Sequence, residues 1–130
     1  MFDFQEAAGP SKLNVVLWGP SGAGKTYTSL ALAHQLGVRV AVLDTEHRAS
    51  ALYARKFPAM IAEMKPPFGP ERFIEGIHAA ERAGFDVLII DSLSPEWEGP
   101  GGCLEQVALA QKAGKKEPMP GAILLHAMTR

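Results

Sequence analysis

Eight consecutive residues have the spacing of a phosphate-binding loop. Two glycines five positions apart are followed by a lysine and a threonine, in the order Gly19, Pro20, Ser21, Gly22, Ala23, Gly24, Lys25 and Thr26. Glycines let the backbone curl so that successive N–H groups point inward at phosphate oxygens. Lys25 can reach the β- and γ-phosphates as a point charge, and the Thr26 hydroxyl can ligate magnesium. This Walker A pattern, or P-loop, predicts that the chain binds ATP with Mg²⁺.

Two acidic residues end apolar runs farther along the chain. Asp44 follows residues 38–43, and Asp91 follows residues 87–90. Ligands bind beyond the carboxyl ends of parallel strands, so we expect both acids to converge with the loop. Asp91 has the form of a Walker B acid, which binds magnesium through water, and a helix N-cap is the alternative. Asp86 flanks the second run at its amino end and is expected to be an exposed cap rather than a site residue.

Glu46 stands two residues beyond Asp44. A carboxylate there could accept a proton from, or orient, the water that attacks the γ-phosphate. Spacing alone leaves this role open. His47 is expected to be a loop histidine, because no second histidine or cysteine has metal-ligand spacing.

The elements that must position these residues alternate along the chain. Apolar runs predict strands at 12–18, 38–43, 60–64, 86–91 and 122–127. Apolar spacing and glycine or proline stops predict helices at 25–36, 49–56, 70–83 and 103–112, with loops over 92–102 and 113–121. The alternation predicts an α/β fold, a three-layer α/β/α sandwich with a mostly parallel sheet.

Length and composition favour one globular domain. The 130 residues are 47% apolar and are expected to form a single domain, with residues 1–12 as a lead-in and 13–130 as the core. Thirteen basic and fourteen acidic side chains give no support to a globally basic surface. Without a membrane-spanning run or a secretory signal at the N-terminus, the cytoplasm is the expected compartment.

The residues around these motifs resemble the RecA-like ATPase core. Residues 43–47 and 53–56 look like the RecA segment that carries the catalytic glutamate, and residues 90–92 look like its Walker B strand. More closely, the chain is similar over nearly its whole length to phage-encoded RecA-like nucleotide-binding proteins of the AAA ATPase grouping. The further carriers of this likeness are Tyr27, residues 66–68, residues 72–74 and residues 91–99.

This resemblance implies roles for particular residues. Lys25 and Thr26 act on phosphate and magnesium, Asp91 is the Walker B acid and Glu46 is the base, so that Glu46 and Lys25 are the implied catalytic residues. Tyr27 is counted with the loop as nucleotide-binding.

The resemblance also orders the end of the chain. It places the strand 122–127 between the loop strand and the Walker B strand. Thr129 and Arg130 then fall at the position of the γ-phosphate sensor, and an exposed terminal arginine is the alternative. The family continues with further helices and strands beyond this point, which is consistent with a chain truncated at its C-terminus.

The implied activity is Mg²⁺-dependent hydrolysis of ATP to ADP and phosphate in phage DNA recombination or replication. Its expected partners are single-stranded DNA, phage recombination proteins and further copies of the chain. One alternative is a small-molecule or nucleoside kinase, for which Arg48 and Arg55 could be recruited. Another is a nucleotide-binding module without turnover. A GTPase is disfavoured because the guanine-reading Asn/Thr-Lys-x-Asp motif does not occur.

Overall fold

A parallel sheet forms the centre of the fold. The computed structural model describes residues 12–47, 52–53 and 55–113. Within them, β1 (Val40–Asp44), β2 (Met60–Glu63) and β3 (Val87–Asp91) form one sheet in the order β2-β1-β3, with both neighbouring pairs parallel. The helices are α1 (Lys25–Leu36), α3 (Pro70–Arg82), α4 (Ser94–Glu98) and α5 (Cys103–Lys112). The expected α/β class is confirmed.

The central strand β1 has the pattern of a buried parallel strand. Its sequence Val-Ala-Val-Leu-Asp is buried at every position. Such a run, apolar on both faces, is typical of a parallel strand covered by other elements. The register pairs Asp44 with Glu63 on β2 and with Asp91 on β3. The carboxyl ends of the three strands are therefore level with one another.

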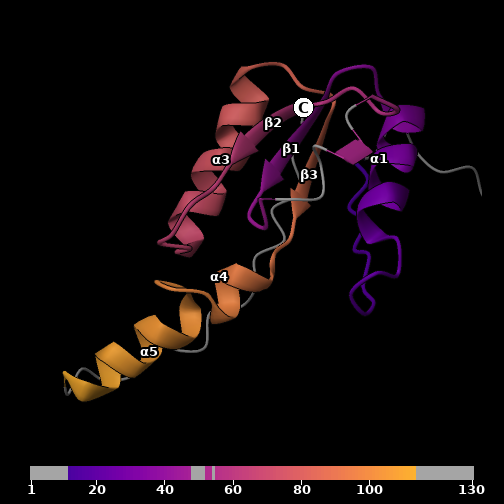
Figure 1. Cartoon of the computed structure of the whole chain (residues 1–130). Coiled ribbons are helices and arrows are strands. Elements are labelled where there is room, and N and C mark those ends of the chain that lie inside the picture. Colours follow the sequence, from indigo (N-terminus) through magenta and orange to yellow (C-terminus); the bar gives the residue numbers. More distant parts are fainter. Residues whose placement is uncertain (1–11, 48–51, 54, 114–130) are drawn as a thin grey trace, which may run out of the picture.

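Helices α1 and α3 flank the sheet (Figure 1). Helix α3 begins at Pro70 and buries Phe73, which joins Leu43 and two neighbours, Met64 and Phe68, in the main apolar cluster. On α1 the buried residues are Leu30 and Ala33. Burial of these apolar faces is the main force that holds the helices to the strands. The full three-layer sandwich stays a prediction.

The first expected strand is wrong in the structure. Residues 12–18 are not a strand, and their apolar side chains are exposed, with Trp18 at 96%. An apolar run becomes a strand only where a neighbouring strand satisfies its backbone N–H and C=O groups. The implied neighbour, residues 122–127, lies outside the described residues, and no described strand pairs with the outer edge of β3.

Other expectations differ in part. The loop predicted over 92–102 contains helix α4, a five-residue segment with proline in its first turn. Of the helix predicted over 49–56, Leu52 and Tyr53 are helical, whereas residues 55–56 lie in a turn. Helix α5 has the predicted bounds and extends away from the sheet (Figure 1). None of the described helices is long and apolar enough to cross a bilayer.

Candidate functional site

The loop at residues 19–26 leads directly into α1. Gly22 and Gly24 have φ angles of 79° and 84°, a left-handed conformation that glycine adopts without strain. The ammonium group of Lys25 donates hydrogen bonds to the carbonyl oxygens of Gly19 and Pro20, at 3.0 and 2.9 Å. The lysine is thereby folded back over the loop. Helix α1 begins at this lysine. The N–H groups in the first turn of a helix have no partner within the helix, which is why such ends bind anions.

Thr26 and Asp91 meet although 65 residues separate them. The Thr26 hydroxyl donates a hydrogen bond to Oδ2 of Asp91 at 2.6 Å. One group comes from the first turn of α1 and the other from the last position of β3. The structure thus brings together the two side chains that sequence motifs had assigned to magnesium.

The carboxylate of Asp44 builds a turn at the end of β1. It is buried, at 4% exposed, and Oδ1 accepts the backbone N–H groups of Glu46 and His47 at 2.9 and 2.8 Å. His47 has a φ of 59°, a left-handed conformation that the turn must hold. Its Nδ1 lies 3.8 Å from a carboxylate oxygen of Glu63 on β2. Asp44 therefore fixes the backbone on which Glu46 stands.

Two hydroxyl side chains join this turn to the end of β3. The buried Thr45 hydroxyl donates to the carbonyl oxygen of Ser92 and accepts the Ser92 N–H, both at 2.8 Å. The Ser92 hydroxyl donates to Oε1 of Glu46 at 2.7 Å. The sequence motifs assign no role to Thr45 or Ser92. The available signal was a hydroxyl residue directly after each strand-end aspartate.

Tyr27, on α1, contacts two aromatic side chains of the segment between β1 and β2. Its ring makes edge-on contacts with Tyr53 and Phe57, with centroids 5.7 and 5.2 Å apart. The Lys56 ammonium donates to the Tyr27 hydroxyl at 2.8 Å and lies 4.9 Å from the ring centroid. These contacts attach the segment after β1 to α1. They also leave the nucleotide contact expected of Tyr27 as a prediction.

Thr26 on α1 and Asp91 at the end of β3 fit a magnesium ion that is held largely by a nucleotide. Thr26 and Asp91 offer oxygen atoms, which Mg²⁺ prefers, at one place. No cluster of three or more acidic, histidine or cysteine side chains suited to a metal occurs in the described part of the chain. A protein-only cage is not needed, because Mg²⁺ in nucleotide sites takes one or two protein groups, phosphate oxygens and water.

Asp86 occupies the opposite end of β3, as expected. Its Oδ2 accepts the backbone N–H groups of Arg39 and Val38 at 2.8 and 3.0 Å. These two hydrogen bonds, that from Arg39 being the stronger influence, lower the pKa of Asp86 below its ordinary value. The carboxylate ties the start of β1 to the start of β3 and is remote from the loop.

Two further pKa shifts fall on the helices that follow β3. Burial raises the pKa of the Glu96 carboxyl on α4. Burial also raises the pKa of the Cys103 thiol, and the negative charge of Glu96 adds to this effect. Cys103 thus stays a protonated thiol at neutral pH, which suits a small hydrophobic side chain better than a nucleophile.

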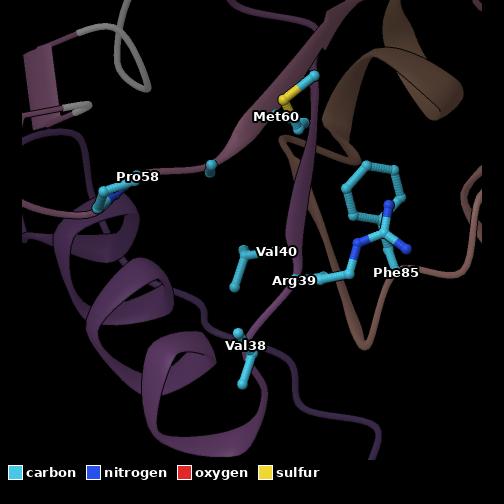
Figure 2. A pocket seen from close by; sticks show the side chains of 7 residues that line it. Val38, Arg39, Val40, Pro58, Met60 and Phe85 are labelled. Atoms are coloured by element: carbon cyan, nitrogen blue, oxygen red, sulfur yellow. The ribbon is translucent and has the colours of Figure 1, made fainter.

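A pocket of about 420 Å³ lies at the amino ends of β1 and β2, opposite to Asp44, and Figure 2 shows the side chains that line it. Its lining is apolar apart from Arg39, and includes Val38, Val40, Pro58, Ala59, Met60 and Phe85. The Arg39 guanidinium lies 5.0 Å from the centre of the Phe85 ring and donates to the Gly84 carbonyl. This pocket therefore lacks the polar groups that the loop and the strand ends provide.

The two expected sensor residues, Thr129 and Arg130, lie outside the described residues. The same holds for Arg48. Arg55 is described and is exposed.

Comparison with known proteins identifies the family. A family model described as an AAA domain matches residues 11–120, which include the loop, both strand-end acids and Glu46. Neither the curated proteins nor the solved structures gave a match. Since the family model covers well over half of the chain, the protein belongs to this AAA domain family of P-loop NTPases, whose common activity is nucleotide binding.

Proposed function

We propose that this protein is a Mg²⁺-dependent ATPase of the RecA-like type that hydrolyses ATP to ADP and phosphate. The observation that carries the proposal is the hydrogen bond between Thr26 and Asp91 beside the glycine loop. It joins the Walker A threonine to the strand-end acid, the two groups that a P-loop site uses around the metal. Membership of the AAA domain family supports nucleotide binding. The polar side chains at the carboxyl ends of the strands support hydrolysis.

The loop and Lys25 bind the phosphates in this proposal. Backbone N–H groups of residues 19–26 cradle the oxygens, and the Lys25 ammonium exchanges its two loop carbonyls for the β- and γ-phosphates. Charge-assisted contacts of this kind are about twice as strong as neutral ones. Tyr27, in the first turn of α1, is proposed to contact the nucleotide beside the loop.

Thr26 and Asp91 hold the metal side of the site. Bound Mg²⁺ would neutralise charge that develops on the β- and γ-phosphate oxygens. Thr26 would offer its hydroxyl oxygen to the ion, and Asp91 would accept hydrogen bonds from water on it. Their present contact of 2.6 Å shows that both side chains reach one point.

Glu46 is the proposed base. Its carboxylate takes a proton from the water whose oxygen attacks the γ-phosphorus, while the bond to the ADP oxygen breaks. The turn built by Asp44 fixes the Glu46 backbone level with the carboxyl end of β3. Asp44 itself is a weaker candidate because it is buried and accepts two backbone N–H groups.

The setting of this activity is proposed from the resemblance. Residues 1–130 would act as one domain in the cytoplasm, coupling hydrolysis to phage DNA recombination or replication. Single-stranded DNA, recombination proteins and further copies of the chain are the proposed partners. Thr129 and Arg130 keep their proposed role as the γ-phosphate sensor.

Phosphate release from ATP tests the proposal. We expect release that requires Mg²⁺ and increases when single-stranded DNA is added. A screen of nucleosides and other small phosphate acceptors runs beside it, since transfer to an acceptor would identify a kinase instead. Tight MgATP binding without phosphate release, in either DNA condition, would contradict the ATPase and favour a binding module without turnover.

A further inference from the structure

The end of β3 carries two adjacent side chains that face different parts of the site. Asp91 contacts Thr26 of α1, whereas the next residue, Ser92, contacts Glu46 on the turn after β1. One strand end therefore connects both the proposed metal side and the proposed base. The two connections use different side chains, so each can be removed without the other.

Glu46 needs such a connection. The Asp44 carboxylate fixes its backbone, but the side chain of a glutamate has three rotatable bonds and is exposed here. A general base works only when its carboxylate lies within hydrogen-bond reach of the reacting water. A hydrogen bond from a rigid partner removes most of this freedom before the reaction begins.

Ser92 is a rigid partner because its backbone is held on two sides. Its N–H donates to the Thr45 hydroxyl and its carbonyl accepts from the same hydroxyl, both at 2.8 Å. Thr45 is 5% exposed, and its own N–H donates to the carbonyl oxygen of Asp91. Solvent therefore has little access to compete for these bonds. The Ser92 side chain extends from a fixed backbone toward Glu46.

We propose that Ser92 is a positioning residue whose hydroxyl holds Oε1 of Glu46 and thereby aims the other carboxylate oxygen at the attacking water. The inference rests on the ATPase proposed above. In this inference Ser92, which follows the proposed Walker B acid Asp91, acts on the proposed base Glu46. Thr45 supports that role indirectly, by fixing the Ser92 backbone.

The test is steady-state ATP hydrolysis by the full chain. Ser92→Ala removes the hydroxyl but keeps the backbone bonds to Thr45, so we expect normal folding. The value of kcat should fall about 10-fold or more while MgATP affinity stays unchanged. Ser92→Thr, which keeps a hydroxyl, should recover much of the lost rate. Ser94→Ala, at an exposed serine two residues later, is the matched control and should hydrolyse ATP at the wild-type rate.

A double variant separates positioning from general folding. In a Glu46→Gln background, Ser92→Ala should cause no further loss, because Ser92 acts only through Glu46. An equal loss in both backgrounds would overturn the inference, and so would a wild-type rate for Ser92→Ala. If the wild type releases phosphate while these results are negative, only the role of Ser92 fails. If the wild type binds MgATP and releases none, the ATPase proposal fails and this inference fails with it.

Discussion

The two ends of β3 carry the same residue type in different surroundings. At the carboxyl end, Asp91 accepts a hydrogen bond from the side-chain hydroxyl of Thr26, a residue of the phosphate loop. At the amino end, Asp86 accepts two backbone N–H groups from Val38 and Arg39. In the function proposed above, the first carboxylate would exchange the Thr26 hydroxyl for water on Mg²⁺, whereas the second ties the start of β1 to the start of β3. Position relative to the strand direction thus separates a proposed site acid from a structural one.

The surroundings of the two ends of β3 also differ, being polar near Asp91 and apolar near Asp86. Near Asp91 lie the loop, the Asp44 turn and the hydroxyl pair Thr45 and Ser92, all engaged through polar contacts. Near Asp86 lies the apolar pocket of Figure 2, where Arg39 is occupied by an aromatic ring and a carbonyl group. Pocket size alone would select the amino end, whereas chemistry on phosphate needs fixed polar groups more than it needs volume.

The largest effect is expected from Lys25→Ala. The substitution removes the point charge proposed to bind the β- and γ-phosphates. Because the change lies in an exposed loop, the fold should be retained. We expect no ATP binding at micromolar nucleotide with an unchanged circular dichroism spectrum. Isothermal calorimetry with Mg²⁺ present measures this. If the variant binds ATP with wild-type affinity, residues 19–26 are not the phosphate-binding loop.

Glu46→Gln should have the next largest effect. The substitution keeps the size of the side chain and removes its ability to accept a proton, so it acts mainly in the transition state. We expect kcat to fall by about 100-fold or more with nearly unchanged nucleotide affinity. Asp44→Asn is the comparison variant. If Glu46→Gln keeps the wild-type rate and Asp44→Asn loses it, Glu46 is not the base.

The smallest effect concerns stability at the amino end. Because the folded-state pKa of Asp86 is lowered, the stability it contributes is present above the unfolded pKa of about 3.9 and is lost as pH falls through the lower folded value. Asp86→Asn should lower the unfolding temperature at neutral pH, and the gap to wild type should close as pH falls from about 5 to about 3. Thermal unfolding over this pH series measures it. A gap that widens in acid would show that the charge of Asp86 opposes folding.

Much of the fold followed from local patterns. Helix α5 has its predicted bounds because a glycine turn precedes Cys103 and helical spacing continues to Lys112. Helix α4 was missed because five residues are too few to show a period. The strand over 12–18 failed for another reason, since an apolar run does not contain its own pairing partner.

For the candidate site, too, the motif residues were predictable from the sequence, whereas some side-chain contacts were not. The fixed spacing of the loop and the parallel register placed Lys25, Thr26 and Asp91 at one end of the sheet. The bonds from Ser92 to Glu46 and from Thr45 to Ser92 depend on side-chain rotamers across two strands. No periodicity encodes such rotamers, so these contacts required the structure.

The most direct test of the difference between the two ends of β3 is a MgATP titration of two matched variants, Asp91→Asn and Asp86→Asn. Each removes one carboxylate charge from the same strand region. We expect Asp91→Asn to weaken Mg²⁺-dependent binding by about 10- to 100-fold, as for other groups that orient a metal shell. Asp86→Asn should bind MgATP with wild-type affinity. Equal affinities for both variants, or a loss confined to Asp86→Asn, would contradict the assignment of the carboxyl end as the nucleotide site.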